Sequence, residues 1–434
     1  MRISSTMMTG NYLNQLNKAY EDQTKLMEQS DGSKLHRPSD DPVGYSKYLR
    51  YTDSSAENAQ YQENVNTALS WMKTTDTALV NVTNILQTFK EKTTAAANGT
   101  NNDSDMDAIA KEMLAELQEV VSDMNVQIGD RYVFSGQSDL LQPFTFSNEK
   151  LDRGLSKTLD NNQMSYFNDA DVSNDISQML TMQDDEGHEY YLNTLTGNIY
   201  TAEFVNKGYK DKITAGQKTV TSGDEVGSVT GFKVSDYFDN SGVINSSGSS
   251  YTATVTVDGK SVDLKLKTIK QYIVTYNGDD KYISMTKKNG AQDQSSDTVN
   301  LTGKDVFASN IFDDANSGNA SSACAVINDL LTVQAQTDAS NHDWLGMDGM
   351  TISDNAHATV VNSESKLAAR QNVYTNVQKM LTAQDEIITG DITTVSATDV
   401  AQLAVRMMEA QMVYNMSLSV GGKILPPSLA DYIS

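Results

Sequence analysis

Few residues of this 434-residue chain have the types and spacing that chemistry requires. His188 and Glu189 begin the H-E-x-x-H pattern of zinc proteases, in which two histidines one helical turn apart hold the metal. The position of the second histidine is Leu192, and the three other histidines stand at no ligand spacing. We therefore expect His188 to be a surface side chain and the chain to hold no metal.

Motifs for nucleotides and nucleophilic catalysis are also missing from the sequence. It contains no G-x-x-x-x-G-K loop, G-x-G-x-x-G turn or G-x-S-x-G elbow. The acidic run at residues 103–107 lacks the Gly and the terminal Glu of an EF-hand, which favours helix capping. Cys324 is the only cysteine, so neither an intrachain disulfide nor a four-cysteine zinc site can form. The sequence predicts no enzymatic activity and no cofactor.

Charge and hydropathy exclude two classes of partner. The formal net charge of −24 opposes binding to nucleic acid and to anionic membranes. The start MRISSTMMTG lacks the long apolar region of a signal peptide, and no apolar run of about 18 residues could span a membrane. We expect no nucleic-acid partner, no membrane partner and no cleaved signal.

Helical periodicity dominates the N-terminal third. Between residues 1 and 30, apolar positions recur at spacings of three and four, which predicts a helix with one apolar stripe. A second helix should run from Pro42 to Asn98 or Gly99, since Gly is the usual residue beyond a helix C-terminus. The predicted stripes are Leu13, Leu16, Tyr20, Gln23 and Met27 in the first helix and Val65, Leu69, Met72, Asp76, Leu79, Thr83 and Leu86 in the second.

More helices are predicted on either side of the middle of the chain. One should begin at Asp103 or Ser104, double back on the second helix and extend its apolar stripe to Ile128. Helices return from Ala320, and after a loop containing Trp344 and Gly346 a long helix should pair with the N-terminal helices. Its heptad positions are Leu367, Arg370, Tyr374, Val377, Leu381, Gln384 and Ile388.

The last helix, capped by Ser396 or Thr398, has an apolar face too wide for one neighbour. Met at helical spacing is usually core filling, but Met407, Met408, Met412 and Met416 with Val413 exceed what a two-helix seam hides, which favours a face buried between subunits. The stripes of residues 1–35 and 400–434 lack an intramolecular partner of matching extent. We therefore expect both ends to become ordered on assembly.

Residues 137–318 differ in composition, with short apolar runs between loops rich in Gly, Ser, Thr, Asn and Asp. Asp258-Gly259 should join residues 251–257 to 261–267 as one hairpin, and Asn277-Gly278 should join residues 271–276 to 281–287 as another. This pattern predicts a β-rich insert. Its ends should leave and re-enter one helical bundle, so deletion of residues 145–315 should leave the helices folded.

Residues 35–44, LHRPSDDPVG, separate the first two predicted helices. Pro38 and Pro42 cannot continue the preceding helix, whereas Asp41 is a good N-cap and Pro42 suits the first helical position. On local physics alone this stretch is a capped helix start. Three further stretches accompany it: MRISSTMM at the start, RYVFSG at residues 131–136 and SLADYI at residues 428–433.

Together these stretches resemble the bacterial flagellin family, and within it the branch at the junction of hook and filament. The matching turn motif consists of Arg37, Pro38, Ser39, Asp40, Asp41, Pro42 and Gly44. The resemblance covers roughly the first 145 and last 110 residues by inspection, where two helical ends flank a variable insert. Pro426 and Pro427 depart from the family by interrupting its terminal helix.

The resemblance, with the periodicity, implies an α+β multidomain chain: a long antiparallel helical bundle or coiled coil built from both termini, with a β-rich central insert. The expected segments are axial helices at 1–40 and 398–434, bundle segments at 41–140 and 319–397, and the insert at 141–318.

The resemblance also implies a structural subunit of the extracellular flagellum, exported without a cleaved signal. The implied partners are further copies in a ring, a neighbouring hook-associated protein, flagellin and an export chaperone. Filament flagellin is the alternative, and a secreted binding module in the insert is a further one. The candidate subunit interface contains Leu13, Leu16, Tyr20, Leu403, Met407, Tyr414, Leu429 and Tyr432.

Overall fold

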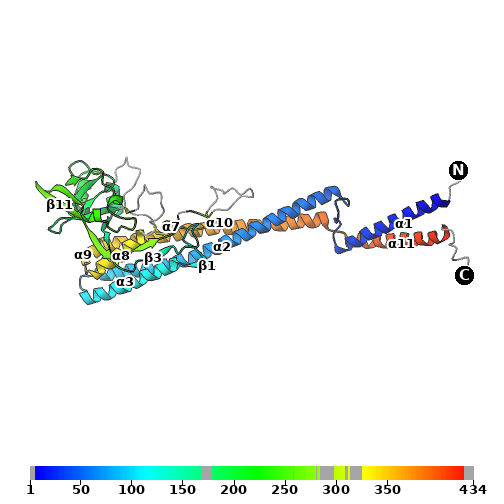
Figure 1. The fold of residues 1–434 in the computed structure, drawn as a ribbon, viewed down its shortest axis with the longest axis horizontal. Coiled ribbons are helices and arrows are strands. Elements are labelled where there is room, and N and C mark those ends of the chain that lie inside the picture. Colours follow the sequence, from blue (N-terminus) through cyan, green and yellow to red (C-terminus); the bar gives the residue numbers. More distant parts are fainter. Residues whose placement is uncertain are drawn as a thin grey trace. The chain divides into compact units, whose positions relative to one another are not determined.

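The computed structural model describes residues 5–167, 178–257, 259–279, 281–283, 298–307, 311–312 and 325–424 (Figure 1). The chain forms two compact units, Met1–Thr67 with Thr375–Ser434 and Ala68–Tyr374. The predicted fold class is confirmed, because long helices from both ends flank a β-rich insert. The five-segment division remains a prediction.

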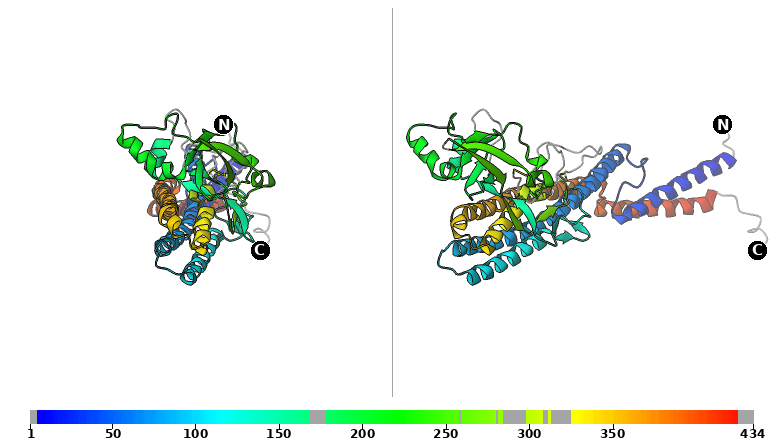
Figure 2. Two further views of the ribbon diagram at one scale, coloured as in Figure 1. Left: turned by 90° about the vertical axis from the view of Figure 1, so that its left-hand side faces the viewer. Right: turned by 60° about the vertical axis from the view of Figure 1, so that its left-hand side comes forward.

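The first unit consists of helices from both ends of the chain. It contains α1 (Ser5–Glu28), the start of α2 (Pro42–Ala96), the end of α10 (Met350–Ser396) and α11 (Val400–Ile424). Helices α1 and α11 lie side by side (Figures 1 and 2). Helices α2 and α10 are joined here by the Asn58 side-chain amide, which donates to the Leu381 carbonyl at 3.0 Å.

Helix α2 keeps the predicted seven-residue repeat but changes its second position. Val65, Met72, Leu79 and Leu86 are buried as predicted. Leu69, Asp76 and Thr83 are only half-buried, and the residue before each is buried instead. The prediction of these three positions is wrong, because the residue one place earlier in the sequence is the buried one in each case. The buried positions of this repeat in α2 are Val65, Ala68, Met72, Thr75, Leu79, Val82, Leu86, Phe89, Thr93 and Ala96.

Helix α3 (Asp103–Met124) begins one residue after its observed cap. Asn102 accepts a hydrogen bond from the Asp105 backbone N–H at 3.0 Å, and the Asp105 carboxylate accepts one from the Asn102 N–H at 3.4 Å. This reciprocal pair is a capping box, so neither Asp103 nor Ser104 is the cap. Ile128 lies beyond the helix, in strand β1 (Gln127–Ile128).

The helices after the insert start near the predicted place. Helix α8 (Ala325–Asp338) is buried from Ile327 to Thr337 and packs against α3, as Figure 2 shows in yellow and cyan. Trp344 and Gly346 do not lie in a loop. They belong to α9 (His342–Trp344) and to a wide helical turn, Leu345–Gly349, that leads directly into α10.

The insert is an antiparallel β-structure with short helices. Its main sheet has seven strands in the order β10-β11-β6-β7-β8-β9, with β5 also paired to β6. Two outlying pairs, β4 with β12 and β3 with β13, lie between this sheet and the helices. The strands after β1 are β2 (Arg131–Tyr132), β3 (Phe144–Phe146), β4 (Leu151–Gly154), β5 (Ser156–Thr158), β6 (Gln178–Gln183), β7 (Glu189–Leu192), β8 (Asn198–Thr201), β9 (Gly227–Ser228), β10 (Thr252–Val257), β11 (Lys260–Leu266), β12 (Thr268–Gln271) and β13 (Val274–Tyr276). The short helices are α4 (Asn161–Phe167), α5 (Tyr209–Thr214), α6 (Ser246–Ser249) and α7 (Gly303–Phe307).

One predicted hairpin is confirmed and the other is wrong. Strands β10 and β11 pair with Val257 opposite Lys260, and Gly259 takes a positive φ of 76° in the turn. Residues 271–276 instead divide between β12 and β13, which pair with the earlier strands β4 and β3. Residues 281–283 form no strand, and residues 284–287 lie outside the described residues. Burial of Tyr276 against Phe144, with ring centroids 5.2 Å apart, favours the long-range pairing over the local turn.

Arg153 on β4 fastens the insert to helix α8. Its guanidinium is 1% exposed and donates to Asp329 Oδ1 at 2.7 Å and Thr332 Oγ1 at 2.9 Å. Gln178 Nε2 donates to the second oxygen of Asp329 at 2.7 Å. The buried carboxylate is therefore paired on both sides, as a buried charge requires.

Candidate functional site

The terminal helices α1 and α11 pair along one side of each. The less exposed positions recur at spacings of three and four, and Leu403 is the most buried of them at 6% exposed. The Tyr12 hydroxyl donates to the Ser417 carbonyl at 3.1 Å, and the rings of Tyr20 and Tyr414 lie 6.3 Å apart. The seam is made of Tyr12, Leu16, Ala19, Gln23 and Leu26 from α1 and Leu403, Met407, Ala410, Tyr414 and Ser417 from α11.

The candidate interface residues fall into three groups in the structure. Leu16, Leu403, Met407 and Tyr414 line the seam between α1 and α11, whereas Leu13 and Tyr20 are 46% and 60% exposed. Leu429 and Tyr432, like Pro426 and Pro427, lie outside the described residues. The expectation that the terminal stripes lack an intramolecular partner is wrong, because each helix partners the other. A role between subunits remains a prediction for all eight residues.

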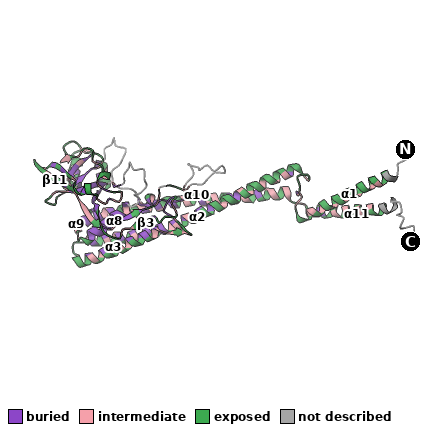
Figure 3. Ribbon diagram, in the orientation of Figure 1, coloured by how far each residue is buried: buried purple, intermediate pink, exposed green. Residues whose placement is uncertain are grey.

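A methionine stripe covers the opposite side of α11. Met408, Met412 and Met416 are 67%, 64% and 63% exposed and follow one another at intervals of four residues. At 3.6 residues per turn they face away from the seam positions. They line an open groove of about 500 Å³, and Figure 3 shows both terminal helices as mostly exposed or half-buried. This apolar face is uncovered in the single chain.

Asp41 caps helix α2, as the sequence predicts. Its Oδ1 accepts hydrogen bonds from the backbone N–H groups of Val43 at 3.1 Å and Gly44 at 3.0 Å. Pro42 takes the first helical position, where its missing N–H costs nothing. Gly44 has a structural reason at this place, since a side chain there would collide with the Asp41 carboxylate.

Asp40 and Arg37 hold the turn that precedes this cap. Asp40 Oδ2 accepts from the backbone N–H groups of His36 at 3.2 Å and Arg37 at 2.9 Å. The Arg37 guanidinium reaches back to Glu28 Oε1 at 2.5 Å, near the end of α1. The turn at residues 37–44 thus links the end of α1 to the start of α2.

The same turn is joined to the connection between α10 and α11. The Lys34 N–H donates to the Ser396 carbonyl at 2.7 Å, and the Thr398 N–H donates to the Gly32 carbonyl at 3.0 Å. Asp399, rather than Ser396 or Thr398, caps α11, because its Oδ1 accepts from the N–H groups of residues 401 and 402 at 3.0 and 3.1 Å. The predicted caps of α11 are wrong by one to three residues.

His188, where the partial zinc-protease pattern begins, is a surface residue paired with Asp184. His188 is 67% exposed, and its ring Nδ1 lies 3.0 Å from Asp184 Oδ2. Burial raises the pKa of Asp184, but the hydrogen bonds from His188 outweigh it, so the net shift is downward. Over the described ranges, no group of three or more His, Cys, Asp or Glu side chains could hold a metal ion. Cys324 lies outside those ranges.

Over the residues that the structure describes, no helix combines the length and the apolar character that crossing a membrane requires.

Sequence reasoning missed the hydrogen bonds that join the α1–α2 connection to the α10–α11 connection. Gly32 was visible as a residue suited to positive φ, and its φ is 96°. The partner segment 396–398 carries no such mark in the sequence.

Proteins of the bacterial flagellum are similar to this chain. Residues 3–139 match the family model for the bacterial flagellin N-terminal helical region. Hook-associated protein 3 of Salmonella typhimurium is 31% identical over 146 residues, which cover 33% of this chain and 46% of that protein. A flagellin of Shigella flexneri is 27% identical over 327 residues, which cover 66% of this chain and 56% of that protein.

The chain spans about half the length of these two relatives. Among solved structures, flagellar hook-associated protein 3 of Legionella pneumophila is 12% identical, with a TM-score of 0.38 over 80% of this chain and 98% of that one. The predicted resemblance is confirmed: the chain is flagellin-like and, within that family, resembles hook-associated protein 3.

Proposed function

We propose that this chain is a structural subunit of the bacterial flagellum that forms the junction between hook and filament. The observation that carries the proposal is the pair of terminal helices with an uncovered methionine stripe on α11. Large exposed apolar patches on a soluble chain mark surfaces that bind other chains. The match of residues 3–139 to flagellin and the similarity to hook-associated protein 3 support the flagellum as the assembly.

In this proposal the seam between α1 and α11 holds each subunit's ends together, and the stripe packs against neighbouring axial subunits. The partners are further copies in a ring, the adjoining hook-associated protein and flagellin. Flexible methionine side chains adapt to surfaces of more than one shape, which suits a subunit with different neighbours on its two sides. The role is structural and not catalytic.

Export is part of the same proposal. The subunit reaches the extracellular flagellum through the flagellar secretion channel without a cleaved signal, and an export chaperone covers its apolar ends beforehand. Secretion assays in a strain that lacks the flagellar export apparatus test this step. Accumulation of the chain outside such cells at the normal level would contradict it.

Immunogold labelling of isolated flagella with antibodies against the insert tests the location. We expect a single band where hook and filament meet. Labelling along the whole filament would identify the chain as filament flagellin instead. That second candidate is favoured by one observation, the Shigella flexneri flagellin match that extends over 66% of this chain.

The stripe is tested by charge. Met408→Asp and Met412→Asp place a carboxylate on a surface that the proposal buries, where an unpaired charge is strongly unfavourable. We expect cells with either variant to release filament protein into the medium and to lose motility. Leu195→Asp is the matched control, because Leu195 is 48% exposed in the insert. Normal filaments on cells with both stripe variants would refute the interface.

A further inference from the structure

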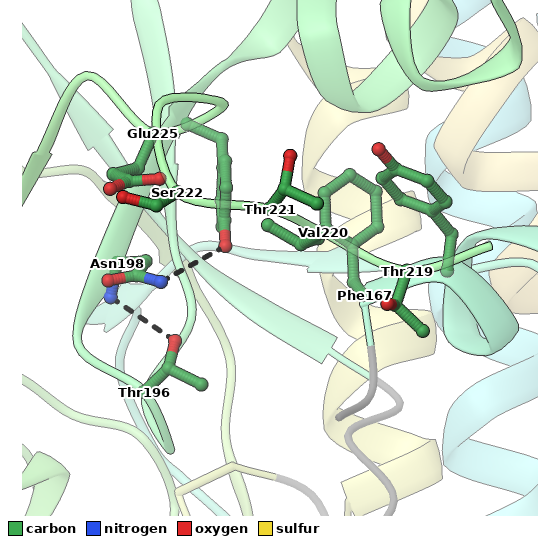
Figure 4. Close-up of a pocket in the computed structure, with 10 residues that line it drawn as sticks. Phe167, Thr196, Asn198, Thr219, Val220, Thr221, Ser222 and Glu225 are labelled. Carbon is green, nitrogen blue, oxygen red and sulfur yellow. Dashed lines mark hydrogen bonds between the residues drawn. The ribbon is translucent and has the colours of Figure 1, made fainter. Parts of the chain in front are cut away.

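The insert contains a pocket of about 270 Å³ that the proposed assembly does not use. It lies between β8, helix α4 and the loop that precedes β9 (Figure 4). Ligand pockets are usually about 300–1,000 Å³, so this one is slightly smaller than that range. It has room for a single small ring and not for an extended chain.

Aromatic rings form the inner wall of the pocket. Tyr166, Phe167 and Tyr200 are 1%, 3% and 1% exposed, and Phe167 lies edge-on to Tyr200 with ring centroids 5.2 Å apart. The rings also pack against Tyr209 and Val205 in one apolar cluster. Such interlocked rings keep their positions without a ligand, so the wall cannot collapse into the pocket.

Polar groups form the opposite rim, and Figure 4 shows them together: Thr196, Asn198, Ser222 and Glu225. Asn198 Nδ2 donates to the Tyr200 hydroxyl at 3.4 Å, and Glu225 Oε2 accepts from the Gly223 N–H at 3.1 Å. Asn198 Oδ1 and Glu225 Oε1 have no hydrogen-bond partner within the described part of the chain. Both acceptors can therefore receive hydrogen bonds from a ligand.

Asp224 holds the rim loop in place. Its side chain is 2% exposed and accepts hydrogen bonds from Lys212 Nζ at 2.8 Å, Gln217 Nε2 at 2.6 Å and the Thr221 N–H at 3.0 Å. The loop carrying residues 219–222 is thus fixed before any ligand arrives. A rim that is already ordered loses little entropy on binding, which favours recognition of a small molecule.

We propose that this pocket binds one ring of a neutral sugar. A pyranose carries hydroxyl groups that both donate and accept hydrogen bonds, and the pocket offers a rim of both donors and acceptors beside a closely packed aromatic cluster whose rings are 1–3% exposed. Lys and Arg do not line the pocket and Glu225 does, so an anionic ligand is disfavoured. Hydrogen bonds to a carboxylate are roughly twice as strong as neutral ones, which gives Glu225 the main orienting role.

Saturation-transfer NMR and calorimetry on the full chain test the proposal. The probes are the methyl β-glycosides of glucose, galactose and N-acetylglucosamine, with N-acetylneuraminic acid as an anionic probe and tetramethylammonium as a cationic one. We expect at least one neutral glycoside to bind with a dissociation constant of about 1 mM or tighter. The anionic probe should not bind.

Two variants locate the binding. Glu225→Gln keeps the shape of the rim but removes its charge, and Asn198→Ala removes the free amide acceptor. Each should weaken the glycoside about tenfold or more, the effect of losing a good hydrogen bond. Glu186→Gln is the control, because its side chain is 83% exposed in a different turn. Unchanged melting temperatures would show that the two variants are folded.

Three outcomes would overturn the proposal. One is the absence of binding by every neutral glycoside. Another is glycoside binding that neither pocket variant weakens, which would place it elsewhere. The third is binding of tetramethylammonium alone, which would make the pocket a site for organic cations. None of these outcomes bears on assembly, so the proposal fails or stands independently of the flagellar one.

Discussion

A Cβ on Gly44 would lie 2.4 Å from the Asp41 Oδ2 atom, closer than side chains approach one another. The same carboxylate caps α2 through its other oxygen, which accepts from the Val43 and Gly44 N–H groups. The absence of a side chain at position 44 and the cap at position 41 are therefore one structural unit.

This relationship predicts non-additive effects on stability. Asp41→Ala should cost about 0.5–2 kcal/mol, the usual effect of losing an N-cap. Gly44→Ala would gain up to about 1 kcal/mol of helix propensity, but it must displace the cap, so we expect a net change near zero or below. In the Asp41→Ala background the same substitution should stabilise the protein. Denaturant unfolding of all four proteins gives the coupling. Equal effects of Gly44→Ala in both backgrounds would show that the Asp41 cap is independent of the residue at position 44.

The hydrogen bonds between the α1–α2 connection and the α10–α11 connection predict a second effect. Gly32 has φ 96° and its carbonyl accepts from the Thr398 N–H. Gly32→Ala should cost about 1–2 kcal/mol locally, because an L side chain disfavours this backbone region. Hydrogen exchange should then speed up at the amides of Lys34 and Thr398 and stay unchanged in α3. Gly10→Ala is the control, since that glycine has open space around it. Unchanged exchange at the Lys34 and Thr398 amides would show that Gly32 does not couple the two connections.

The repeat of seven in α2 was predictable, but its phase was not. Leu69, Asp76 and Thr83 share the spacing of the true seam with Ala68, Thr75 and Val82, and the larger Leu69 favoured the wrong set. Which of two adjacent residues enters a seam depends on the space that the partner helix leaves. A small Ala68 is buried there at 5% exposed, and no property of α2 alone specifies it.

The prediction of the second hairpin was wrong for a related reason. Asn277-Gly278 is the favoured dipeptide of a tight turn, yet the preceding strand pairs with β3, more than a hundred residues earlier. The Tyr276 hydroxyl donates to the Phe134 carbonyl at 2.9 Å, a contact that no local pattern encodes. Long-range burial of aromatic residues outweighed local turn preference here.

Arg153 predicts a large loss of stability on substitution. Arg153→Met leaves Asp329 buried without its cation, which typically costs about 3–5 kcal/mol. Asp329→Leu added to it should restore part of the loss, because the uncompensated charge is then gone. Urea unfolding measures both. Arg131→Met is the matched control: Arg131 is 60% exposed beside Asp139, and exposed pairs contribute at most about 1 kcal/mol. Similar losses for the two single variants would contradict the role given to Arg153.

Acid should loosen the rim of the pocket before the rest of the insert. Burial raises the pKa of Asp224, but the hydrogen bonds from Lys212, Thr221 and Gln217 outweigh it and lower the pKa to about 2 from the usual 3.8. A carboxyl group with a depressed pKa stabilises the fold above pH 3.8, and this stabilisation is lost as the pH falls towards 2. Asp224→Asn should remove this part of the pH dependence in thermal melts between pH 5 and 2. Asp185→Asn, at a 78% exposed side chain, should not. Identical profiles for the wild type and Asp224→Asn would rule out this role for Asp224.

Helix α8 makes the whole insert harder to remove than the sequence indicates. It is buried on all sides from Ile327 to Thr337. Gln334 and Thr337 contact α3, whereas Asn328 bonds to the backbone of Val274 on β13 at 2.8 and 3.0 Å. The outlying strand pairs are therefore part of the helical core. Deletion of residues 145–315 would strip one face of α8, and the expectation that it leaves the helices folded is opposed by these contacts.

A shorter deletion should succeed where the longer one fails. The Leu155 N–H donates to the Lys267 carbonyl at 2.9 Å, and Gly154 is paired with Thr268. Strands β4 and β12 are therefore already an antiparallel pair, and the residues between them form the seven-stranded sheet. Replacing residues 156–266 by Asn-Gly closes that hairpin with a favoured tight turn and keeps the strands that cover α8. We expect this variant to unfold cooperatively with its helical signal largely intact, and the 145–315 deletion to show a lower, broader transition and faster hydrogen exchange in α8. The loss of Gln178 and of the Ser241 carbonyl, both partners in the Arg153 cluster, should still reduce the stability of the shorter variant. Circular dichroism melts and exchange of the α8 amides distinguish the two. Equal protection of α8 in both deletions would show that the outlying strands are dispensable and that α3 alone holds the helix.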